Sequence, residues 1–257
     1  MIPLQDMHVH TTYCDGNNTP VEMAEEAFKL GIRTLGFSRH SYPDEDGADD
    51  TRLRMYLDEI EKLKQHFAGK MRILTGIELD VIHRKPAYAF DYVIGSVHYV
   101  QKDDHVLQID MCREEFLAAA QNFFDGDVLS MAEAYYQAVG NVVEITDCDI
   151  IGHFDLIAKF NENDSLFDSC HPRYLRAWKT AANRLLASGR LFEINTGAIS
   201  RGYRTIPYPS PEIYAYLKAE GARFVFGSDS HSVQMLRDSC GYPLPECVTA
   251  DTDLFQI

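Results

Sequence analysis

The sequence predicts an α/β fold in which parallel βα units close into a barrel. Seven strand-like apolar segments are mostly separated by helical ones, the pattern of a parallel sheet with crossover helices. No G-x-G-x-x-G loop is found, so an open doubly wound sheet is the less favoured alternative. No linker, low-complexity segment or short repeat interrupts the 257 residues, and we expect residues 1–257 to form a single domain.

The first βα unit has the clearest boundaries. The apolar segment Ile2 to His10 is followed by a capping box of Thr19 and Glu22, which predicts a helix that begins there and ends at Gly31. The other expected strands are Thr34–His40, Arg72–Val81, Tyr92–Val100, Asp149–Leu156, Leu191–Ile199 and Arg223–His231. Further helices are expected at about 50–67, 113–139, 173–189 and 210–221, while 232–257 remains unassigned.

Composition excludes several classes of protein. The formal net charge of -15 argues against a nucleic-acid surface, which needs clustered Lys and Arg. The six cysteines include no C-x-x-C pair, so neither a zinc ribbon nor a compact disulfide framework is indicated. No apolar run has the length of a membrane span and the N-terminus lacks the features of a signal peptide, so we expect a cytoplasmic protein.

Two pairs of polar residues lie at the first and last expected strands. His8 and His10 are two residues apart, so on a strand their side chains project to the same side. Asp229 and His231 repeat this spacing. If the sheet closes, the first and last strands become neighbours, and the two pairs meet at one rim.

The ends of the intervening strands carry further candidate metal ligands. His40, Glu78, His98 and His153 lie late in strands two to five, and Asp15 lies in the first βα loop. The C-terminal ends of the strands carry the chemistry of βα barrels. Glu78 has apolar neighbours, and a buried carboxylate is costly unless it is paired or bound to metal. These nine residues together predict a metal site at that rim, whereas each histidine alone would be interpreted as a structural core residue.

The remaining histidines follow no such rule. His66, His83, His105 and His171 lie away from the expected strand ends and are interpreted as surface or structural residues.

The chain resembles the polymerase and histidinol phosphatase (PHP) superfamily of metal-dependent phosphoesterases. The resemblance rests on "HVHTTYCDG", "FSRH", "GIELD", "IGSVH", "IGHFD" and "FGSDSH", which occur in the order of the family and run almost end to end. The length and the phrases "GHFDLI" and "YPSPEI" are most similar to the stand-alone histidinol-phosphate phosphatases of histidine biosynthesis.

This resemblance implies a distorted (β/α)7 TIM-like barrel with three divalent metal ions. It assigns His8, His10, Glu78 and Asp229 to one ion, Asp15, His40 and His231 to a second, and Glu78, His98 and His153 to a third. The mixed imidazole and carboxylate ligands suit Zn, Fe or Mn. Arg39 departs from the family pattern, in which an acidic residue is common at this position, and it is expected to face solvent.

The implied activity is hydrolysis of a small phosphate monoester, with L-histidinol phosphate as the first choice of substrate. Two ions about 3.5–4 Å apart can share a water and lower its pKa, which makes a bridging hydroxide the expected nucleophile. Arg201 is the first candidate for binding the phosphate and Lys159 the second, followed by Arg204 and Arg39. The acidic segment from Pro43 to Asp50 is a candidate for the cationic end of the substrate.

Three other functions remain open from the sequence. The first is a PHP phosphoesterase that acts on nucleotides, oligonucleotides or other small phosphate esters. The second is an amidohydrolase, whose barrel also begins with H-x-H but typically places a bridging lysine on strand four, where this chain has His98. The third is a non-catalytic metal-binding domain, although a closed structural site needs only four ligands. The oligomeric state is not predicted.

Overall fold

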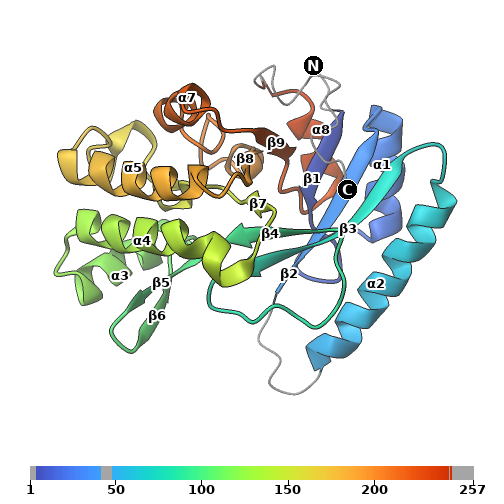
Figure 1. Ribbon diagram of the computed structural model, residues 1–257, viewed down its shortest axis with the longest axis horizontal. Helices are drawn as coiled ribbons and strands as arrows, with labels where there is room; N and C mark the ends of the chain where they lie inside the picture. Colours follow the sequence, from blue (N-terminus) through green and yellow to red (C-terminus); the bar gives the residue numbers. More distant parts are fainter. Residues whose placement is uncertain (1–3, 42–47, 243, 245–257) are drawn as a thin grey trace.

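The computed structural model describes residues 4–41, 48–242 and 244. Its centre is a parallel sheet of seven strands in the order β1-β2-β3-β4-β7-β8-β9 (Figure 1). These strands are β1 (Gln5–Val9), β2 (Thr34–His40), β3 (Arg72–Asp80), β4 (Tyr92–Ser96), β7 (Ile150–Ile151), β8 (Leu191–Asn195) and β9 (Phe224–Gly227). All seven expected strands are therefore present, in chain order across the sheet.

The two edges of this sheet meet, which confirms the barrel rather than the open sheet. Val9 and Ser230 form a parallel bridge, and the backbone N–H of His10 donates to the carbonyl of Ser230 at 2.9 Å. Deeper in the seam, the Asp6 carboxylate accepts the backbone N–H of Ser228 at 2.9 Å. Closure thus brings the last strand beside the first, as the placement of the predicted ligands requires.

Helices surround the strands (Figure 1). They are α1 (Pro20–Leu30), α2 (Ala48–His66), α3 (Arg113–Phe123), α4 (Val128–Thr146), α5 (Pro172–Leu186), α6 (Gly197–Ser200), α7 (Pro211–Ala219) and α8 (Val233–Ser239). Helix α5 shows how they attach: Tyr174, Trp178, Ala181 and Leu185 recur at helical spacing and are all buried. Among the described residues, no helix is both long and apolar enough to cross a membrane.

Local signals set the boundaries of α1 as expected. The Thr19 hydroxyl accepts the backbone N–H of Glu22 at 3.3 Å, and the Glu22 carboxylate accepts the backbone N–H of Thr19 at 2.8 Å. Gly31 ends the helix with φ of 87°, a left-handed conformation that glycine adopts without strain. The capping box and both helix boundaries are confirmed.

Two expected elements differ from the structure. The fourth strand ends at Ser96 rather than Val100, and the chain then forms an antiparallel hairpin of β5 (Tyr99–Lys102) and β6 (His105–Gln108). The single helix expected at 113–139 is two helices, because the chain turns at Gly126 with φ of 75° before α4 begins. The hairpin is relevant to function because its residues form part of the cavity described in the next section.

Candidate metal centre

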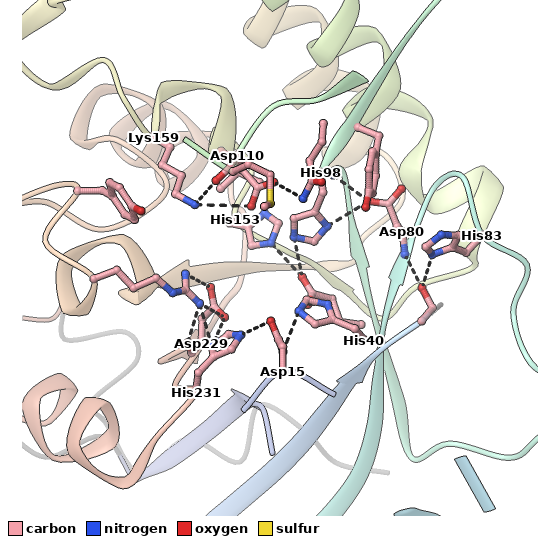
Figure 2. A pocket seen from close by; sticks show the side chains of 18 residues that line it. Asp15, His40, Asp80, His83, His98, Asp110, His153, Lys159, Asp229 and His231 are labelled. Carbon is pink, nitrogen blue, oxygen red and sulfur yellow. Dashed lines mark hydrogen bonds and ion pairs between the residues drawn. The ribbon is translucent and has the colours of Figure 1, made fainter. Parts of the chain in front are cut away.

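The predicted ligands lie around one cavity at the C-terminal ends of the strands (Figure 2). The cavity has a volume of about 340 Å³. Its lining includes Asp15, His40, Glu78, His98, His153, Asp229 and His231. His8 and His10 lie behind this lining and have no exposed surface. Sheet closure therefore brings all nine predicted residues together.

Glu78 lies at the centre of five imidazoles. Its carboxylate is almost fully buried at the end of β3 and accepts a hydrogen bond from the Ser96 hydroxyl at 2.7 Å. Oε2 lies 3.3 Å from His8 Nε2, 3.5 Å from His10 Nε2 and 2.8 Å from His40 Nδ1, while Oε1 lies 3.5 Å from His98 Nε2 and 3.0 Å from His153 Nε2. The carboxylate is thus placed to bridge more than one cation.

The donor atoms divide into three groups, each small enough to surround one ion. Within each group the ligand atoms lie within 4.8 Å of one another. The groups are His8, His10 and Asp229; His10, Asp15, His40 and His231; and Glu78, His98 and His153. These groups match the three sets implied by the family resemblance, except that His10 also joins the second group and Glu78 is absent from the first.

The buried atoms of this cluster that lack a hydrogen-bond partner among the described residues include His8 Nε2, His10 Nε2 and Glu78 Oε2. The two nitrogens lie 3.3 and 3.5 Å from Glu78 Oε2. A buried polar atom left without a partner costs about 1–3 kcal/mol. A divalent cation would satisfy all three, and imidazole with carboxylate is a donor set that Zn, Fe and Mn accept. The residues therefore fit a transition-metal centre.

The carboxylates of the cluster stay ionised in spite of their burial. Burial raises the pKa of the Glu78 carboxyl, but the imidazoles of His8 and His40 outweigh this effect and hold its pKa well below its usual range. Burial acts the same way on Asp229, where the Arg201 guanidinium and His8 outweigh it and lower the pKa. The cavity floor is therefore anionic and attracts cations.

The same charges raise the pKa of several imidazoles. Burial lowers the pKa of His98, but the Glu78 carboxylate and a hydrogen bond with Asp80 outweigh burial and raise this pKa to about 9. The pKa of His40 is raised as well, against burial, by Glu78 and Asp15. An imidazole must be neutral to bind a metal ion, so protons and cations compete for these nitrogens.

Two of the predicted phosphate-binding residues line the cavity. Arg201 donates from Nη1 and Nη2 to the two carboxylate oxygens of Asp229, at 3.2 and 3.0 Å. Lys159 donates to the backbone carbonyl of Asp110 at 2.6 Å, and its Nζ lies 4.8 Å from the centre of the Tyr203 ring. Both cations therefore stand beside the anionic cluster, as Figure 2 shows for Lys159.

The other two predicted substrate-binding residues do not line the cavity. Arg39 is 1% exposed, so the expectation that it faces solvent is wrong; it donates to the backbone carbonyls of Tyr13 and His40. Arg204 is 6% exposed and lies 3.8 Å from the buried Asp155 carboxylate. Both guanidinium groups are held inside the fold by partners that are distant in sequence or on the backbone.

Other residues of the site were missed by the sequence analysis. Glu193 in β8 lies 2.6 Å from His8 Nδ1, and Asp80 in β3 lies 3.1 Å from His98 Nδ1. His83, interpreted as surface or structural, lines the cavity. Glu193 and Asp80 each lie between apolar residues of an expected strand, which is the same pattern that identified Glu78. The acidic segment 43–50 falls largely outside the described residues.

The comparisons with known proteins agree with this geometry. The profile of a family described as PHP domain matches residues 6–197, which is most of the chain. The chain belongs to the PHP domain family. This membership favours a phosphoesterase over the amidohydrolase alternative, and the matched range contains the first five of the six motifs.

Several relatives of this PHP protein carry names that point to one substrate. The protein is 29% identical over 246 residues to a Deinococcus radiodurans protein named "Probable histidinol-phosphatase", covering 90% of this chain and 87% of the relative. Its fold is similar to a Listeria monocytogenes crystal structure, with a TM-score of 0.75, 20% identity and coverage of 90% and 96%. A second similar structure is the Lactococcus lactis histidinol phosphate phosphatase complexed with Zn, L-histidinol and phosphate, with a TM-score of 0.60, 19% identity and coverage of 92% of each chain.

Proposed function

We propose that this PHP protein is a metal-dependent phosphatase that hydrolyses L-histidinol phosphate to L-histidinol and phosphate in histidine biosynthesis. The proposal depends chiefly on one observation. Buried atoms of His8, His10 and Glu78 that can bind a metal ion lack a hydrogen-bond partner among the described residues, and they lie next to two cationic side chains of the cavity. The identity of the proposed substrate comes from the names of relatives, which are histidinol phosphatases. The closed sheet that builds the site extends from the first strand to the last, which supports one domain.

The proposed metal centre uses all nine predicted ligands. His8, His10, Glu78 and Asp229 would hold one divalent ion, Asp15, His40 and His231 a second, and Glu78, His98 and His153 a third, with Zn, Fe and Mn as the candidates. When bound, such ions supply Lewis-acid chemistry and a water acidic enough to attack phosphorus near neutral pH.

The protein's own cations orient the phosphate. Arg201 presents a planar guanidinium whose geometry matches two phosphate oxygens, and Lys159 adds a point charge. Burial lowers the pKa of Lys159, opposed chiefly by the charge of Asp110, and Arg201 lies near enough to contribute to this lowering. A phosphate dianion between the two cations would relieve their repulsion. Their fixed positions would also stabilise the charge that grows on the oxygens as the ester bond breaks.

The β5–β6 hairpin and the segment after it form the wall that would contact the leaving group. Tyr99, Gln108, Asp110 and Met111 line the cavity there. Burial raises the pKa of Asp110, but the charges of His98 and Lys159 outweigh it and keep this carboxylate ionised. An ionised carboxylate beside a tyrosine and a methionine suits a leaving group that carries an ammonium and an imidazole.

The size and charge of the cavity favour a small ester over a polynucleotide. A volume of about 340 Å³ fits a small metabolite. The net charge of -15 disfavours binding of a long polyanion. A mononucleotide would still fit by size, so specificity must be measured directly.

The deciding experiment is a panel of esters assayed with the metal-loaded protein and with a chelator-treated control. The panel contains L-histidinol phosphate, glycerol phosphate, a nucleoside monophosphate and an amide. We expect kcat/KM for histidinol phosphate to exceed the other values by at least 100-fold, and the chelator to abolish turnover. Equal rates for histidinol phosphate and glycerol phosphate would refute the specific assignment, and amide hydrolysis would refute the reaction class.

A further inference from the structure

Glu193 is a buried carboxylate outside the cavity lining that contacts two of the proposed metal ligands, His8 and His153. It lies in β8 and is 1% exposed. Oε1 lies 2.6 Å from His8 Nδ1, and Oε2 accepts the backbone N–H of His153 at 2.7 Å and the Asn195 side-chain amide at 3.1 Å. Glu193 does not line the cavity and belongs to none of the three groups of ligand atoms, so we treat it as a residue that supports the ligands.

This contact decides which nitrogen of His8 carries the proton. A neutral imidazole has one N–H donor and one acceptor nitrogen, and an ionised carboxylate can only accept. With Glu193 at Nδ1, the N–H must be on Nδ1, which leaves the lone pair on Nε2. That nitrogen is the buried atom without a hydrogen-bond partner in the described part of the chain, and it faces Glu78 and Asp229.

The backbone leaves room for this pair at one glycine. Gly227 in β9 lies beside both side chains, and a Cβ built there would stand 1.9 Å from Glu193 Oε1 and 2.8 Å from His8 Cβ. Atoms do not approach so closely, so any side chain at position 227 would push the carboxylate or the imidazole away. The absence of a side chain at Gly227 is therefore a condition for the contact between Glu193 and His8.

A second carboxylate repeats the arrangement on another ligand. Asp80 Oδ2 lies 3.1 Å from His98 Nδ1, and His98 Nε2 points to Glu78 at 3.5 Å. The Asp80 carboxylate also accepts the backbone N–H of His98 at 2.8 Å. In both cases a buried acid holds Nδ1 and leaves Nε2 directed at the cluster.

We propose that Glu193 is a positioning residue that fixes the Nδ1–H tautomer of His8, and so keeps Nε2 available to a metal, while it anchors the backbone at His153. This inference rests on the proposed function, because it takes His8 to be a metal ligand. Carboxylates behind metal-bound imidazoles typically change metal affinity by about 10–100-fold when they are replaced.

The test is the variant Glu193→Gln, which keeps the size of the side chain. Its amide oxygen can still accept the two N–H groups now at Oε2, so its amide nitrogen turns to His8 and donates to Nδ1. The proton of His8 then moves to Nε2, where no metal can bind. We expect one Zn²⁺ site to weaken by about 10–100-fold in a chelator competition titration.

The matched control is Glu26→Gln, which removes a carboxylate that pairs with Arg237 outside the cavity and should leave Zn²⁺ affinity unchanged. Glu193→Gln with wild-type affinity would overturn the inference. If this variant does not fold, the ¹⁵N–¹H spectrum of the Zn²⁺-loaded wild type decides: a protonated Nδ1 on His8 supports the inference, and a metal-bound Nδ1 overturns it. His8→Ala separates the two claims, because normal zinc content in that variant would refute the proposed ligand set itself.

Discussion

Zinc affinity should rise steeply with pH, because protons and metal ions compete for the same nitrogens. In the metal-free protein the pKa of His98 is about 9, whereas the unfolded chain has the ordinary value of 6.5. This difference corresponds to a free energy on the order of 3 kcal/mol. Protonated His98 thus stabilises the metal-free fold fully below pH 6.5, and this contribution is lost as the pH rises through 9.

A bound metal ion has the opposite requirement, since the His98 imidazole must be neutral to bind it. Expelling the His98 proton alone should weaken Zn²⁺ binding on the order of 100-fold at pH 6.5 relative to pH 8.5. His8 and His40 add to this effect, because the pKa of each is raised against the effect of burial by neighbouring carboxylates. The gap in melting temperature between the zinc-loaded and the metal-free protein should therefore widen with pH.

The assay is a competition titration against a chelator of known proton affinity at pH 6.5, 7.5 and 8.5, with calorimetric melting curves at each pH. The control is His98→Gln, in which the pH dependence should become shallower by about one proton. An affinity for Zn²⁺ that is equal at the three pH values, or stronger at pH 6.5, would refute the argument that ionised carboxylates raise the pKa of these imidazoles.

Three further predictions concern residues outside the ligand set. Arg201→Met should lower kcat/KM by about 10–150-fold, since a hydrogen bond to a charged group contributes about 1.5–3 kcal/mol; unchanged kinetics at normal metal content would exclude its role. Arg204→Met should instead destabilise the fold by about 3–5 kcal/mol in urea unfolding, because it removes the positive charge beside the buried Asp155 carboxylate. Thr19→Ala should lower the free energy of unfolding by about 1 kcal/mol through loss of the α1 cap, and equal stability would contradict the capping box.

The parts of the fold that were predictable have local causes. The capping box at Thr19 and the left-handed Gly31 define α1 without help from the rest of the chain. The β5–β6 hairpin was not predictable in the same way, because its apolar residues continue the pattern of the fourth strand. The chain leaves the sheet after Ser96, and Tyr99 pairs with Gln108 instead. Whether the chain continues along the sheet or turns into a hairpin depends on packing against other elements, which the hydrophobic periodicity of the sequence does not reveal.

The candidate site also combines features that the sequence predicts with features that depend on distant partners. The convergence of its nine candidate ligands was predictable because strand ends meet at one rim of a closed parallel sheet, whatever the details of packing. The directions of Arg39 and Arg204 were not, since each depends on a partner that no local pattern reveals: the Tyr13 carbonyl for one and Asp155 for the other. Glu193 carried a usable signal, an acid between apolar strand residues, but its partner His8 lies 185 positions away in the sequence.

The most direct test of the central claim is an anomalous diffraction map of crystals grown with zinc. The account predicts peaks inside the cavity, about 2.0–2.2 Å from ligand atoms of the three groups, with Glu78 beside more than one peak. A map with no peak at Glu78, from protein fully supplied with zinc, would contradict the claim that sheet closure builds a metal centre from these side chains.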